Sequence, residues 1–179
     1  MREPSAKLIT GVLYPATVDF DWFGWVVSEL EALWGVAEII SDSVPFNHTD
    51  YYHEIASSLL RRFICFGGMR GAGGLVDWKK EAIAIEAKSR SPRVVNIDPG
   101  YIDGARLVLA STKDHAHRVY VRDGIFAEVT MRYRNKKWAH FDYTFPDFAS
   151  GVYDPFLTEA RRLWMKEHNV NVIPPQKIV

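Results

Sequence analysis

Apolar side chains recur along the chain with two different periods, which together predict both strands and helices. Apolar, β-branched runs over residues 7–14, 36–46, 49–55 and 59–66 are typical of strands that lie against a core. A helical segment lies between the first two runs. These two strands could therefore be parallel neighbours joined by a right-handed crossover.

Three segments place apolar residues three and four positions apart, which is the spacing of one helix face. The first helix is expected to begin at a capping Asp19 or Asp21 and to end at Gly35. The second is expected to run from a capping Asp77 to about Ser89, and the third to begin at Asp154-Pro155. The residues expected to face inward are Trp22, Val26, Leu30, Leu33 and Trp34, then Trp78, Ala82 and Ile85, then Phe156, Leu157, Ala160, Leu163 and Trp164. The glycine-rich stretch 67–74 and the tail from Asn169 are expected to be irregular, and the glycines predict a flexible loop.

The stretch from Val94 to Ala110 changes period several times. Residues 94–97 are expected to form a short strand, and Pro99-Gly100 then suits the middle of a type II turn. Asp103 can cap either a short helix or an extended run as far as Ala110, and we favour the helix.

A hairpin is the clearest short-range signal in the chain, with its bend at Asp123-Gly124. A two-residue turn there would put Val119 opposite Glu128 and so mix apolar and charged side chains on one face. A three-residue loop with Gly124 in the left-handed conformation puts Val119 opposite Ala127 instead. We predict the second register because it separates the two kinds of side chain.

This register gives the hairpin, over residues 117–121 and 125–133, an apolar face and a polar face. The apolar face is expected to hold His117, Val119, Val121, Ile125, Ala127, Val129 and Met131. The polar face is expected to hold Arg118, Tyr120, Phe126, Glu128, Thr130 and Arg132. After a turn at Asn135-Lys136, a third strand is expected over residues 138–143. We therefore predict a single α+β domain, with a mixed, largely antiparallel sheet of about six to seven strands and three main helices.

Composition and charge narrow the class of protein. A chain of 179 residues suits one domain, and its zero net charge, from 22 Lys plus Arg and 22 Asp plus Glu, argues against a general nucleic-acid binder. Cys65 is the single cysteine, which excludes an internal disulfide and any zinc site that needs two thiolates. No apolar run approaches the roughly 18 residues of a membrane helix. The N-terminal MREPSAK also lacks the apolar segment of a signal peptide, so a cytoplasmic protein is expected.

Charged side chains on the hairpin are the first candidates for chemistry. Arg118 and Arg132 could hold a phosphate or carboxylate beside Thr130, with Glu128 orienting the arginines. The alternative is a solvated cross-strand ion pair, which contributes well under about 1 kcal/mol. Aromatic residues share this face and favour the ligand site.

Polar groups gather at two further segment ends. Ser111-Thr112-Lys113-Asp114 could grip an anionic ligand or serve acid–base chemistry, and it could equally form a turn closed by side-chain hydrogen bonds. Asn96, Asp98 and Tyr101 surround the Pro-Gly pair. Asp98 therefore suits either a catalytic carboxylate or a turn cap.

Two other kinds of site are not supported by the motifs. His115 and His117 with Asp98 or Asp114 could bind a divalent metal, but no standard ligand spacing supports this, and no metal site is predicted. The stretch GGMRGAGG lacks the Lys-Ser/Thr of a phosphate loop. The sequence therefore indicates no particular cofactor.

The chain resembles domain-of-unknown-function family 4416 over almost its whole length. The similar stretches are KLITGVLYP, PFNHTDYY, RRFICF, NIDPGYIDGARLVLASTKDHAHRVYV, DGIFAEVTMRY and YTFPDF. Lys79 and Glu86 also fit the family pattern, whereas Ala82-Ile83 replaces a Thr-Asn pair and the GGMRGAGG loop departs from it. The resemblance implies a stand-alone domain with no established activity. A GTP-binding label attached to some similar proteins has no phosphate-loop support here.

These residues favour an enzyme or binding protein for a small anionic ligand, phosphorylated or nucleotide-like. The assigned roles are anion binding by Lys113, Arg118 and Arg132, acid–base chemistry by Asp98, Glu128 or Asp114, and further ligand contacts by Asn96, Tyr101, Ser111, Thr112 and Thr130. The alternative is an RNA- or protein-binding module without catalytic activity. The basic residues available to such a module are Arg90, Arg93, Arg134, Lys136 and Lys137. A third hypothesis is an interaction subunit without a pocket.

Overall fold

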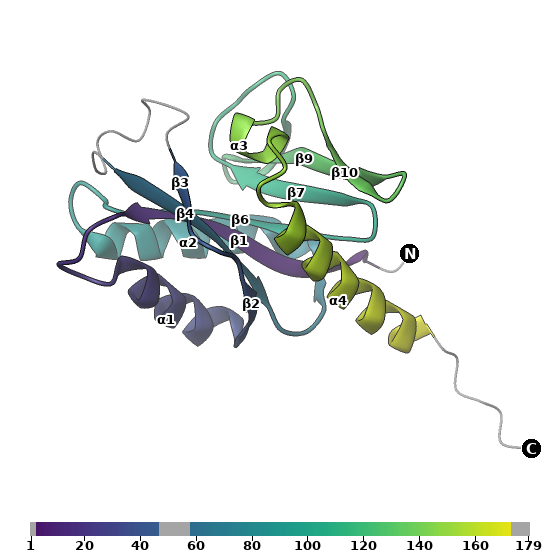
Figure 1. Cartoon of the computed structure of the whole chain (residues 1–179), viewed down its shortest axis with the longest axis horizontal. Helices are drawn as coiled ribbons and strands as arrows, with labels where there is room; N and C mark the ends of the chain where they lie inside the picture. Colours follow the sequence, from purple (N-terminus) through teal and green to yellow (C-terminus); the bar gives the residue numbers. More distant parts are fainter. Residues whose placement is uncertain (1–2, 47–57, 173–179) are drawn as a thin grey trace, which may run out of the picture.

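The computed structural model describes residues 3–46 and 58–172, and shows one α+β domain built around a single antiparallel sheet (Figure 1). The main path of the sheet has the strand order β10-β9-β7-β6-β1-β4-β2, and β3, β5 and β8 pair at its sides. The strands are β1 (Ser5–Pro15), β2 (Ala37–Ile40), β3 (Val44–Phe46), β4 (Leu59–Phe66), β5 (Arg70–Gly71), β6 (Asn96–Ile102), β7 (Arg106–Ser111), β8 (Val119–Arg122), β9 (Ile125–Arg134) and β10 (Lys137–His140). The helices are α1 (Trp22–Trp34), α2 (Leu75–Ser89), α3 (Pro146–Ala149) and α4 (Asp154–Val172), with a 3-10 turn at Ala72–Gly74.

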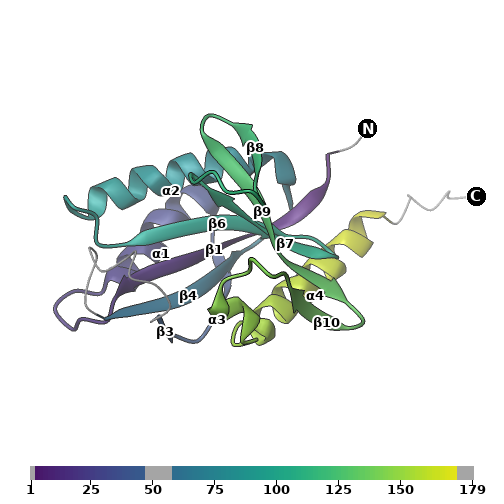
Figure 2. The same cartoon turned by 90° about the horizontal axis from the view of Figure 1, so that it is seen from above.

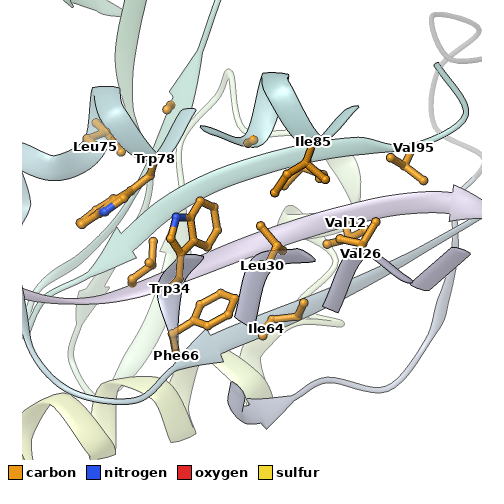
Figure 3. Close-up of a cluster of buried hydrophobic side chains, with 14 of the residues drawn as sticks. Val12, Val26, Leu30, Trp34, Ile64, Phe66, Leu75, Trp78, Ile85 and Val95 are labelled. Atoms are coloured by element: carbon orange, nitrogen blue, oxygen red, sulfur yellow. The ribbon is translucent and has the colours of Figure 1, made fainter. Parts of the chain in front are cut away.

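Two hydrophobic layers sandwich the sheet, as seen from above in Figure 2, with α1 and α2 over one face and α3 and α4 over the other. Strand β1 serves both layers because alternate side chains point to opposite faces. Its Leu8 and Val12 enter the α1–α2 layer, and its Ile9 enters the α3–α4 layer. Figure 3 shows the first layer, where Trp34 meets Phe66 edge to face at 5.3 Å between ring centroids.

Both long terminal helices begin where the sequence predicts. The Asp21 side chain caps α1 by accepting from the Gly24 amide at 2.9 Å, and Gly35 ends the helix with a φ of 78°. Helix α4 begins at Asp154. Most of the expected inward-facing residues are buried, but Leu33 is 54% exposed and its assignment was wrong.

The expected arrangement of the first strands is wrong. Strands β1 and β2 are not neighbours, because β4 lies between them and pairs antiparallel with both. The run 36–46 is two strands, β2 and β3, and both pair with β4. The strand expected over 49–55 lies outside the described residues.

The glycine-rich stretch is not a loop throughout. Arg70 and Gly71 form β5 and pair with β1, and the 3-10 turn then leads directly into α2. Helix α2 consequently starts at Leu75 with Gly74 at its N-cap, so that Asp77 lies in its first turn and does not cap it. At the other end of the chain, residues 169–172 continue α4, whereas an irregular tail was expected.

Strand β6 runs straight through the expected Pro99-Gly100 turn. The expected helix after Asp103 is also wrong, since β7 is a strand. Asp103 instead accepts hydrogen bonds from the amides of Ala105 (2.8 Å) and Arg106 (2.9 Å), and so closes the turn between β6 and β7.

The hairpin combines features of both candidate registers. Asp123 and Gly124 have φ values of 54° and 75°, as a two-residue type I′ turn requires, so the three-residue loop is wrong. The predicted pairing of Val119 with Ala127 is nevertheless present, because Val121 is an extra residue in β8. Strand β8 is exposed along its length, and its expected burial was wrong.

A second irregularity, between β7 and β9, changes the faces of β9. Leu107 pairs with Met131 and Val108 with Val129, which leaves Thr130 without a partner in the β7 ladder. Val129 therefore packs against the α1–α2 layer and Met131 belongs to the α3–α4 layer, although they were expected to share one face. None of the helices in the described part of the chain has the length and apolar character needed to cross a membrane.

Candidate functional site

The candidate site is a cavity of about 140 Å³ at a place where the sheet divides. Strand β6 pairs with β1 over Asn96–Ile102, but with β7 only over Gly100–Ile102. Residues 96–99 of β6 and the end of β7 therefore separate, and α2 and α3 approach the gap from opposite faces of the sheet. The described lining residues are Arg61, Lys79, Ile83, Glu86, Arg93, Asn96, Asp98, Leu109, Ala110, Ser111, Thr112, Lys113, Arg118, Glu128, Thr130, Phe145 and Phe148.

The Pro-Gly pair forms the apex of this fork. Proline has no amide hydrogen to donate and is normally excluded from interior strands. At Pro99 the β7 ladder has not yet begun, so β6 has a neighbour on the β1 side only. At Gly100 the strands come so close that an added Cβ would lie 2.2 Å from the Val108 carbonyl oxygen.

Charged side chains from several elements converge on the cavity. Among the described lining residues, five are basic and three are acidic: Arg61, Lys79, Arg93, Lys113 and Arg118, against Glu86, Asp98 and Glu128. They come from β4, α2, β6, β9 and the loops that follow α2 and β7. Charges in such a partly enclosed site are screened less than charges on the surface.

Lys79 and Asp98 form the centre of the first half of the site. The buried Lys79 ammonium donates to the Ile97 carbonyl at 2.7 Å and to Asp98 Oδ1 at 3.1 Å. Asn96 Nδ2 donates to Asp98 Oδ2 at 2.7 Å. Burial acts to raise the pKa of Asp98, but the charges of Lys79 and Arg61 outweigh it and hold that pKa below its ordinary value. Asp98 is therefore ionised at neutral pH.

Glu86 lies beside this pair and experiences the opposite shift. Burial raises the pKa of Glu86 above its ordinary value, against the opposing effect of Lys79. Its carboxylate accepts from the Ile97 amide at 2.7 Å and from Arg93. Glu86 thus fixes β6 and the segment after α2 to the same helix.

Arg118 and Glu128 form the second half of the site, where both side chains are buried. Arg118 Nε donates to Glu128 Oε2 at 2.8 Å, and its Nη1 donates to Ser111 Oγ at 2.8 Å. Thr130 donates to Glu128 Oε1 at 3.1 Å, and His117 lies 3.1 Å from Oε2. Both oxygens of Glu128 are therefore engaged, and this carboxylate positions Arg118.

A stack of parallel rings supports this half from outside. The His117 ring lies 4.2 Å from Tyr143 between ring centroids, and Tyr143 lies 5.2 Å from Phe141. Arg132 covers Phe141. His117, expected in the apolar face of the hairpin, is instead held between Tyr143 and Glu128.

The structure brings eight of the eleven predicted site residues to the cavity: Asn96, Asp98, Ser111, Thr112, Lys113, Arg118, Glu128 and Thr130. The other three lie elsewhere. Tyr101 packs against the α1–α2 layer because it is three residues from Asp98, and an odd separation in a strand reverses the face. Asp114 is exposed in the loop before β8. Arg132 points away from the cavity because of the bulge at Thr130. Without the bulge Arg132 would share a face with Glu128, but the extra residue puts Met131 on that face and Arg132 on the opposite one.

Several cavity residues were not predicted, notably Arg61 on β4, Ile83 on α2, and Phe145 and Phe148 around the start of α3. Arg61 is an arginine within an apolar strand, a pattern that could have marked it, since a buried charge needs a partner. That partner is Asp147, which also accepts from Tyr153 at 3.0 Å. Among the described residues, no group of three or more His, Cys, Asp or Glu side chains is placed to hold a metal ion.

Comparison with known families accounts for nearly the whole chain. The model of the family described as Domain of unknown function (DUF4416) matches residues 4–164. The chain belongs to this family. The matched range contains all the described residues that line the cavity in this DUF4416 protein. No curated protein and no solved structure matches the chain.

Proposed function

We propose that this protein binds a small anionic ligand in the cavity where β6 and β7 separate. One observation carries the proposal: five basic side chains from four separate segments of the chain converge there with three carboxylates. Concentrating like charges has an electrostatic cost, which a bound phosphate or carboxylate offsets.

The size of the cavity limits how much of a ligand it encloses. Pockets that bury a drug-sized molecule have volumes of about 300–1,000 Å³. The cavity here has about 140 Å³, which accommodates a phosphoryl or carboxylate group with a few further atoms. A phosphorylated or nucleotide-like ligand would therefore place its charged end inside and the remainder at the mouth.

The geometry supports binding better than acid–base catalysis. Glu128 uses both oxygens to hold its neighbours, so its role is to position Arg118. The lowered pKa of Asp98 makes this carboxylate a weak base. Because it stays charged, it can accept a hydrogen bond from a hydroxyl or amine of a ligand. The planar guanidinium of Arg118 is suited to a phosphate or carboxylate.

The alternative of an RNA-binding surface has less support. Arg134, Lys136 and Lys137 lie at the β9–β10 turn, whereas Arg90 and Arg93 follow α2 at the opposite end of the molecule (Figures 1 and 2). Arg90 stacks over Trp22 and Arg93 bonds to Glu86 in the cavity. These five residues therefore do not share one basic face.

Thermal unfolding with inorganic phosphate tests the proposal, with chloride added to keep the ionic strength constant. A ligand at 100 times its Kd stabilises the fold by about 2.7 kcal/mol. We expect Tm to rise with phosphate, and the rise to be reduced severalfold in Lys113→Gln. The matched control is Lys137→Gln, which removes the same charge from an exposed position outside the cavity and should leave the rise unchanged. Binding at this site would be ruled out if phosphate did not raise Tm, or if both substitutions reduced the rise in Tm equally.

A further inference from the structure

The mouth of the cavity has an apolar character that anion binding does not explain. Ile83 and Phe145 both line the cavity, yet they remain 38% and 40% exposed. Leu109 and Phe148 continue the apolar surface inward. Ligand pockets combine apolar side chains with a few placed polar groups, so an apolar mouth beside a charged interior suits a ligand that has one charged and one apolar part.

The two exposed residues belong to opposite layers of the fold. Ile83 lies on α2, which covers one face of the sheet, and Phe145 directly precedes α3, which covers the other. They therefore approach the fork from its two sides.

Both side chains are attached to ordered backbone. Ile83 lies in the middle of α2, and the Phe145 carbonyl accepts from the Ala149 amide at 3.0 Å as part of α3. An apolar group would therefore meet walls that are already in place. Pre-formed walls reduce the entropy lost on binding.

We propose, on the basis of the anion site above, that the ligand is an aryl-bearing anion: a phosphate or carboxylate joined to an aromatic ring. The charged group lies among the basic residues and the ring lies between Ile83 and Phe145. A benzene ring alone occupies a protein cavity of about 150 Å³. The 140 Å³ available therefore cannot enclose both parts, and the ring is left at the apolar mouth.

Calorimetric titration with three probes tests this inference: inorganic phosphate, methyl phosphate and phenyl phosphate. We expect phenyl phosphate to bind at least about tenfold more tightly than methyl phosphate, since apolar groups of even smaller size are discriminated to this extent. Phe145→Ala and Ile83→Ala should each reduce that preference, measured as the ratio of the two affinities in the same variant, severalfold. Ile40→Ala, at a residue that is 40% exposed but outside this cavity, is the matched control and should keep the wild-type preference.

The outcomes separate the two proposals. If inorganic phosphate binds but phenyl phosphate has no advantage, the aryl inference fails and the anion site stands. If none of the probes binds, both fail. If phenyl phosphate is preferred but both substitutions retain the full preference, the ring lies elsewhere and the inference is overturned. A cooperative thermal unfolding transition shows that each variant is folded.

Discussion

At the scale of single residues, Glu128 determines where the cavity presents positive charge. It is buried, as is its partner Arg118, and the two are joined at 2.8 Å. Removing one member of a buried pair leaves the other charge without compensation and typically costs about 3–5 kcal/mol. We therefore expect Glu128→Ala to lower the free energy of unfolding by this order, measured by urea denaturation.

The chain offers a matched control for this prediction. Glu159 and Arg162 form a similar pair at 2.6 Å on the exposed surface of α4. Water and salt screen such a pair, so Glu159→Ala should cause a far smaller loss. Equal losses from the two substitutions would show that burial does not strengthen the Arg118–Glu128 pair.

At the scale of elements, the close approach of β6 and β7 at Gly100 creates the fork. An added Cβ there would lie 2.2 Å from a backbone oxygen, and backbone cannot move aside as a flexible side chain can. We expect Gly100→Ala to separate the two strands, to destabilise the protein by about 1–3 kcal/mol, and to weaken phosphate binding.

Gly67→Ala tests whether that loss is specific to the fork. A Cβ at Gly67 would meet its nearest neighbour, the Val36 carbonyl oxygen, at an ordinary 3.6 Å. Urea denaturation should show little change for this variant. A Gly100→Ala protein of wild-type stability would mean that β7 can shift without cost, and that the fork is not set by this contact.

At the scale of the whole molecule, Asp98 joins the two layers. It contacts Lys79, from the helix on one face, at 3.1 Å, and lies 3.9 Å from Arg61, which bonds to Asp147 of α3 on the other face. Because the pKa of Asp98 is lowered in the fold, the stability of the protein depends on pH through this residue. The stability that Asp98 contributes is present above its unfolded-state pKa, near the ordinary value of 3.8, and is lost as pH falls through the lower folded-state value.

We therefore expect Asp98→Asn to reduce the loss of stability below pH 3.8, measured by urea unfolding at a series of pH values. Glu86 provides a contrast of opposite sign, because its pKa is raised in the fold. The stability that Glu86 contributes is present below its unfolded-state pKa, near the ordinary value of 4.5, and is lost as pH rises through the folded-state pKa. Glu86→Gln should therefore remove the loss of stability that accompanies this rise in pH. Identical pH profiles for wild type and both variants would contradict these assignments.

The sequence by itself determined the elements whose signals are local. Period, caps and turn residues located α1, α4 and the paired strands around Asp123-Gly124, because each depends on neighbours a few positions away. The grouping of polar residues in the stretch from Asn96 to Thr130 also identified eight of the seventeen described lining residues of the cavity. Five of these eight lie on the regular strands β6, β7 and β9, which hold them in fixed positions, and the other three lie in the loop that follows β7.

Only the tertiary structure decided how these elements combine. Pro99-Gly100 reads locally as a turn, and it becomes strand because β1 pairs along its whole length while β7 leaves the ladder there. Arg61, Ile83 and Phe145 reach the cavity from distant elements, and no short-range pattern connects them. Arg132 and Tyr101 lie away from it because one unpaired residue or one odd step in a strand reverses the face. Strand pairing over long sequence separations determines these outcomes, and local preference does not encode it.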